Sequence, residues 1–135
     1  MKEKLIGAWK LKSYTAIDDK GCTIYPFGHN AKGFIIYSAE GYMSATLFNP
    51  DLIDSASAGI SRKDISSGNC LCMSYAGPYN VVSNKVLHNI ETSNIPEMIA
   101  TAQERLFSIK ENALTIKAET VLEGVKYSHT LIWVK

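Results

Sequence analysis

Short strand-like runs separated by turn signals fill almost the whole chain, and this pattern limits the folds open to it. In most runs apolar and polar residues alternate, and Gly, Asn, Asp or Ser clusters bound them. The runs are Leu5–Ala16, Cys22–Tyr25, Gly33–Tyr37, Tyr42–Phe48, Met73–Val82, Lys85–Ser93, Ala102–Lys110, Ala113–Thr120 and Tyr127–Val134. Many short strands with closely spaced turns are typical of an all-β sandwich or barrel. We predict an all-β fold, a single closed and mostly antiparallel β-barrel of eight or nine strands, because closure leaves no strand edge exposed.

The size and charge of the chain agree with one globular domain over residues 1–135. A chain of 135 residues buries about two-thirds of its unfolded surface, which is enough for one core. Lysine and arginine are scattered and the net charge is +1, so neither a nucleic acid nor a membrane is expected as a partner. No apolar stretch has the length of a membrane-spanning helix or of a signal peptide.

The three cysteines predict a compartment rather than a metal site. Cys22, Cys70 and Cys72 are an odd number, and Cys70 and Cys72 are too close together for a C-x-x-C zinc or redox motif. Free cysteine is among the most buried residue types, and free thiols persist in the reducing cytoplasm. We therefore expect buried thiols, a cytoplasmic protein, and no metal or other cofactor.

The loop of one β-hairpin indicates which of its side chains share a face. Gly33–Tyr37 and Tyr42–Phe48 flank a four-residue connection that ends in Gly41, as hairpin loops often do. If Tyr37 pairs with Tyr42, one face of the hairpin is wholly apolar, and we expect this face to lie inside the barrel. Its residues are Phe34, Ile36, Met43, Ala45 and Leu47.

A tryptophan in the first run and an arginine in a late run are spaced as partners in a closed barrel. Trp9 follows Gly7-Ala8, and Arg105 lies within Ala102–Lys110. First and last strands of a closed barrel lie side by side, so an indole can plug one end and a guanidinium can stack on it. We predict this stack of Arg105 on Trp9, which leaves the other end of the barrel for one small molecule.

The longest break in the strand pattern lies between residues 49 and 72. Asn49–Ser57 contains Pro50 and several small residues. Ser61 then has the features of a helix N-cap, with an acidic residue three positions later. We predict one short helix from Ser61 to about Cys72, in a segment that crosses an open end of the barrel as a lid.

A series of short motifs runs through the chain in a characteristic order. The motifs are Tyr25-Pro26-Phe27-Gly28, Ile36-Tyr37, Gly41-Tyr42-Met43-Ser44-Ala45, Tyr75-Ala76-Gly77, His88-Asn89-Ile90-Glu91, Pro96 and Gln103-x-Arg105-x-Phe107. Together they resemble the bacterial and fungal lipocalin-like domain family over nearly the whole chain. The resemblance implies a calycin-type β-barrel that begins with Gly7-x-Trp9. It implies little about function, because one fold hosts many functions.

The inward faces of the strands supply the candidate ligand-binding residues. His88 shares a face with Val86 and Ile90, and there it is a structural hydrogen-bonding group, a ligand contact or a proton-transfer residue. Arg105 is either the partner of Trp9 or an anchor for an anionic ligand. The candidate set is Phe34, Ile36, Met43, Ala45, Tyr75, Tyr79, His88, Ile90, Arg105, Phe107 and His129.

Three functions remain open from the sequence. The leading hypothesis is a barrel that binds a small apolar or amphipathic molecule, oriented by a few polar groups. The second is a cofactor-free isomerase or cyclase that uses His88 as its acid and base. The third is a structural or interaction protein whose barrel is filled by its own side chains, since an eight-stranded barrel permits either outcome. Haem, with His88 or His129 as axial ligand, is a weaker alternative.

Overall fold

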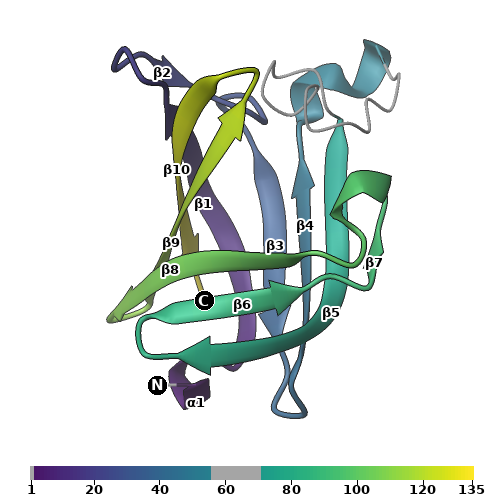
Figure 1. The fold of residues 1–135 in the computed structure, drawn as a ribbon, viewed down its shortest axis with the longest axis vertical. Coiled ribbons are helices and arrows are strands. Elements are labelled where there is room, and N and C mark those ends of the chain that lie inside the picture. Colours follow the sequence, from purple (N-terminus) through teal and green to yellow (C-terminus); the bar gives the residue numbers. More distant parts are fainter. Residues whose placement is uncertain (1, 56–70) are drawn as a thin grey trace.

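Eight antiparallel strands close into a β-barrel (Figure 1). The computed structural model describes residues 2–55 and 71–135. The barrel strands are β1 (Gly7–Ile17), β3 (Lys32–Tyr37), β4 (Tyr42–Phe48), β5 (Cys72–Val82), β6 (Lys85–Asn89), β8 (Ala102–Lys110), β9 (Ala113–Leu122) and β10 (Val125–Val134). Each strand pairs with the next in this order, and β10 pairs with β1 to close the barrel. The barrel predicted from the sequence is confirmed.

Short elements extend the barrel at both ends. β2 (Thr23–Ile24) pairs with β1, and β7 (Thr92–Ser93) pairs with β5. Helix α1 (Lys2–Leu5) precedes β1, and the 3₁₀ helices η1 (Pro50–Ser55) and η2 (Pro96–Met98) follow β4 and β7. In Figure 1, α1 lies at the lower end of the barrel, while β2, the β9–β10 turn and η1 lie at the upper end.

The predicted helix from Ser61 to about Cys72, and most of the predicted lid, lie outside the described residues. At the two edges of that segment, Pro50–Ser55 forms η1 and Cys72 begins β5. Within residues 2–55 and 71–135, every helix is too short or too polar to cross a membrane.

The predicted face of β3 is wrong, whereas that of β4 is right. Phe34 and Ile36 are 53% and 47% exposed, and Ile35 and Tyr37 between and after them are buried. On β4, the three residues predicted to point inward are all buried. Phe34 and Ile36 therefore lie on the outer surface of the barrel and cannot contact a molecule in its lumen.

The hairpin register explains this error. Tyr37 pairs with Met43 rather than with Tyr42. The ladder continues one residue further because the Ser38 backbone N–H donates to the Tyr42 carbonyl at 2.8 Å, and Gly41 turns the chain with a φ of 100°. Side chains alternate along a strand, so a shift of one residue moves every side chain to the opposite face.

Trp9 fills the α1 end of the barrel, but its cationic partner is not Arg105. The indole is 1% exposed, and its Nε1–H donates to the Leu5 carbonyl at 2.8 Å. The Lys135 Nζ lies 4.8 Å from the centre of the indole ring and donates to the Ile6 carbonyl at 3.0 Å. The predicted stack of Arg105 on Trp9 is wrong, because the last residue of the chain takes that place and Arg105 lies at the cavity described below.

The expected burial of the thiols is wrong for Cys22, which is exposed, while Cys72 is partly buried. Cys22 precedes β2, a two-residue strand at the end of the sheet order. The Cys22 side chain is therefore in contact with water. Cys70 lies outside the described residues.

Candidate ligand-binding site

A cavity of about 110 Å³ lies inside the barrel, and all eight barrel strands contribute to its wall. By the same measure roughly 10–15 Å³ holds one water molecule, so the space suits a small organic molecule. Most of the wall is apolar. Examples from four of the strands are Leu47, Met73, Ile116, Leu131 and Trp133.

The structure brings together only part of the predicted ligand-binding set. Five of its residues line the cavity, namely Ala45, Tyr75, His88, Arg105 and His129. Four others are buried in the core without contributing to the cavity wall, namely Met43, Tyr79, Ile90 and Phe107. The remaining two, Phe34 and Ile36, lie on the outside, as described above.

His88 bridges two tyrosine hydroxyls at the cavity wall. Its side chain is 1% exposed, with Nε2 2.6 Å from the Tyr37 hydroxyl and Nδ1 2.9 Å from the Tyr75 hydroxyl. Burial lowers the pKa of His88 to about 3, and the charge of Arg105 acts in the same direction. A neutral imidazole has one N–H and one bare nitrogen, so one tyrosine donates to the ring and the other accepts from it.

His129 repeats this arrangement on β10. Its Nδ1 lies 2.8 Å from the Tyr14 hydroxyl, and its Nε2 lies 2.8 Å from the Thr120 hydroxyl. Burial lowers the pKa of His129 to about 4, again with a smaller contribution from Arg105. Both histidines are therefore neutral hydrogen-bonding groups near pH 7, and both positions predicted to face the lumen do so.

The histidine contacts do not fit haem ligation. All four ring nitrogens of His88 and His129 are hydrogen-bonded to hydroxyl groups, so iron would have to displace a tyrosine or a threonine. Elsewhere in the described part of the chain, no group of three or more His, Cys, Asp or Glu side chains could hold a metal ion.

The three tyrosines that contact His88 and His129 are also neutral. Burial raises the pKa of Tyr14, Tyr37 and Tyr75, and the charge of Arg105 only partly opposes this effect. A protonated phenol both donates and accepts a hydrogen bond. The hydroxyls therefore orient the two imidazoles and can also meet a polar group of a ligand.

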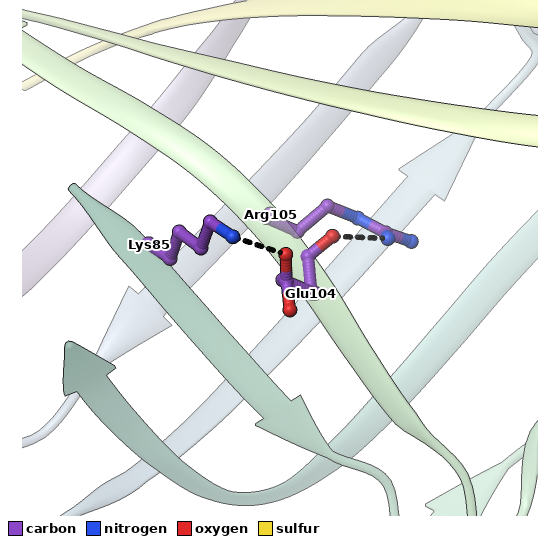
Figure 2. A network of polar contacts seen from close by, with 3 residues as sticks. All are labelled: Lys85, Glu104 and Arg105. Atoms are coloured by element: carbon purple, nitrogen blue, oxygen red, sulfur yellow. Dashed lines mark hydrogen bonds and ion pairs between the residues drawn. The ribbon is translucent and has the colours of Figure 1, made fainter. Parts of the chain in front are cut away.

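Arg105 carries the positive charge of the cavity wall. Its Nη2 donates to the Gln103 Oε1 at 3.3 Å, and its Nη1 donates to the Glu104 backbone carbonyl at 3.1 Å. Figure 2 shows that the Glu104 carboxylate itself is engaged elsewhere, because it pairs with the Lys85 Nζ at 2.9 Å. Since neighbouring side chains on a strand point to opposite faces, Glu104 faces solvent while Arg105 faces the lumen.

A change of partner along β5 brings Tyr75 and His88 together. Tyr75 pairs with β7, but Tyr79 pairs with His88 on β6. Between the two ladders lies Gly77, where a Cβ would sit 1.9 Å from the Asn89 carbonyl oxygen. Only a residue without a side chain allows Asn89, the last residue of β6, to come this close to β5. The close approach at Gly77 thus lies between the ladders that hold Tyr75 and His88.

The wall formed by β9 is absent from the set predicted from the sequence. Ile116, Ala118 and Thr120 alternate along this strand and line the cavity. Their alternation is visible in the sequence and could have identified them. However, Ala118 is small and Thr120 carries a hydroxyl, so this face lacks the large apolar side chains that are typical of a core. The space that these two residues leave is part of the cavity.

These features define the class of the protein as a small calycin-type β-barrel with an internal cavity. The chain belongs to the lipocalin-like domain family, whose sequence model matches residues 6–135. The family resemblance seen in the motifs is thereby confirmed. Comparisons with curated proteins and with solved structures found no significant match. Barrels of this kind are generally suited to hold one small molecule.

Proposed function

We propose that this protein binds a small, largely apolar molecule in the lumen of its barrel. The observation that carries the proposal is the cavity of about 110 Å³, in which apolar walls surround a few oriented polar side chains. Ligand sites have this composition because apolar contact supplies affinity and fixed polar groups supply specificity. The cavity argues against a barrel that is filled by its own side chains. The exposed thiol of Cys22 favours a reducing compartment, so the cytoplasm is part of the proposal.

The contacts of His88 support a binding role over acid–base catalysis. Both ring nitrogens are hydrogen-bonded to tyrosines, and burial holds the pKa of His88 near 3. A general acid or base works best when its pKa is close to the working pH. We therefore assign His88 to the orientation of Tyr75, whose side chain also lines the cavity.

A thermal-shift screen of small aromatic and aliphatic compounds tests the binding function. The informative variant is Ala118→Phe, because Ala118 lines the cavity and a phenyl group there takes the space of a ligand. The matched control is Lys117→Phe, which adds the same ring at an exposed position of the same strand.

A ligand of the folded state raises the melting temperature. We expect compounds that stabilise the wild type and Lys117→Phe but do not stabilise Ala118→Phe. If no compound stabilises the wild type, or if both variants respond equally, the lumen is not the binding site.

A further inference from the structure

Arg105 has no counter-charge in the described part of the chain. It is the one lysine, arginine, aspartate or glutamate among the described residues that line the cavity. No ion pair of the described residues includes it, and both histidines beside it are neutral, as shown above. A guanidinium stays charged at any physiological pH. A cation in a mostly apolar space loses part of its hydration, and a bound anion would offset that loss.

The carboxylate of Glu104, the residue that precedes Arg105, is not available to supply that anion. Glu104 follows Gln103 and precedes Arg105 on β8, but its side chain lies on the outer face and pairs with Lys85 (Figure 2). Only its backbone carbonyl reaches the guanidinium. Among residues 2–55 and 71–135, the outward ion pair therefore leaves Arg105 without a carboxylate partner.

A chain of neutral hydrogen bonds orients the guanidinium. The Thr101 hydroxyl donates to the Met98 carbonyl at 2.6 Å, and the Gln103 Nε2 donates to the Thr101 Oγ1 at 2.8 Å. The amide of Gln103 is thereby fixed with its oxygen toward Arg105, which donates to it. A guanidinium has five N–H donors in a planar fork, more than Gln103 and the Glu104 carbonyl use. The remaining donors match the two oxygens of a carboxylate.

The surroundings of Arg105 suit one anionic oxygen group and an apolar body. Arg105 influences the pKa of Tyr75, His88 and His129, so its charge extends across the polar part of the wall. The Tyr75 hydroxyl, which shares a hydrogen bond with the His88 Nδ1, adds a neutral polar group there. Beside this cluster, Met73 and Met98 line the cavity, and methionine adapts to ligands of different shape.

We propose that the ligand of this cavity carries a single anionic oxygen group, in the simplest case a carboxylate, and that Arg105 selects for it. The inference rests on the binding function proposed above and goes further by naming the chemical class. It assigns Arg105 to the second of the two roles that the sequence left open. Gln103 is then a positioning residue, since it contacts the guanidinium and is held by Thr101.

Calorimetric titration with naphthoate and its neutral amide, naphthamide, tests the selection at neutral pH. The two probes share one aromatic body and differ in charge. We expect the wild type to bind naphthoate about tenfold or more tightly than naphthamide, because charge-assisted hydrogen bonds are the stronger ones. Arg105→Gln should remove this preference while it retains naphthamide binding within about threefold.

Two further variants keep the result interpretable. Lys85→Gln removes an outward cation on the neighbouring strand and should leave both affinities unchanged, whereas Arg105→Lys should keep part of the preference for naphthoate. Equal binding of the two probes by the wild type, or a preference that survives in Arg105→Gln, would overturn the selection but leave the binding function standing. Failure of both probes to bind the wild type would count against both proposals.

Discussion

His88 and His129 each lie between two hydroxyl groups in the cavity wall. A neutral imidazole is much less costly to bury than an imidazolium, and its two nitrogens hold their partners in fixed directions. Arg105 makes protonation still less favourable for both rings. At the scale of single residues, the two imidazoles and their hydroxyl partners form a neutral hydrogen-bonded frame, and Arg105 is the charged residue of the described cavity wall.

This frame predicts a loss of stability in mild acid. The pKa values of His88 and His129 in the folded protein are about 3 and about 4, below the ordinary value of 6.5. The unfolded chain therefore binds more protons as the pH falls below about 6.5, and the folded state is penalised. We expect the free energy of unfolding to fall by up to about 1.4 kcal/mol per pH unit for each histidine. Urea unfolding between about pH 7 and pH 5, mostly above the titration of ordinary carboxylates, measures this.

Two variants check the assignment of this slope. His129→Gln should reduce the pH dependence by about half, because one of the two titrating groups is gone. His29→Gln is the control, since His29 is exposed, and its slope should match the wild type. An unchanged slope in His129→Gln would show that carboxylates, not the buried histidines, cause the acid sensitivity.

At the scale of elements, β5 carries Tyr75 and also pairs with β6, the strand that carries His88. Gly77 lies where β5 changes its partner, and a Cβ there would lie 1.9 Å from the Asn89 carbonyl oxygen. Gly77→Ala forces the backbone of β5 or the end of β6 to move, and we expect a cost of about 1–3 kcal/mol. Chemical denaturation measures it, and the distance between Tyr75 and His88 should increase as well.

The control for Gly77→Ala is a glycine with free space around it. Gly124 has a φ of 81°, and a Cβ added there would meet no atom within 4 Å beyond its chain neighbours, so Gly124→Ala adds backbone strain without a steric clash. We expect it to cost less than Gly77→Ala. Equal losses would mean that the conformational freedom of glycine, rather than the close approach to Asn89, explains its presence in β5.

The barrel strands could be predicted from the sequence, but the short helices α1, η1 and η2 and one strand face could not. Alternation and turn residues identify every barrel strand, since both signals are local. The face of β3 depends on whether Ser38 belongs to the turn or to the ladder. Two hydrogen bonds between Ser38 and Tyr42 place Ser38 in the ladder, one through its backbone N–H and one through its hydroxyl, and the alternation of apolar and polar residues does not reveal them.

The site could be predicted only in part, for a reason that belongs to the whole molecule. His88 and His129 could be placed inside from the alternation of their own strands. The partner of Trp9 depends instead on how β10 meets β1, where the register shifts between Leu11 and Ser13. This closure brings Lys135 over the indole and leaves Arg105 in the cavity, an arrangement that no local pattern contains.

Trp9 and the cavity lie in different parts of the barrel, so stability and the proposed binding can be tested separately. Trp9 fills the α1 end and does not line the cavity, so we expect Trp9→Ala to lower the free energy of unfolding by about 3–5 kcal/mol. Lys135→Gln should cost only about 0.5–1 kcal/mol, because its cation–π contact is exposed. Urea unfolding measures both losses, and titration with naphthoate under native conditions should give the same affinity for Lys135→Gln as for the wild type. A Trp9→Ala unfolding curve that coincides with the wild-type curve would show that the indole does not support the closed end of the barrel.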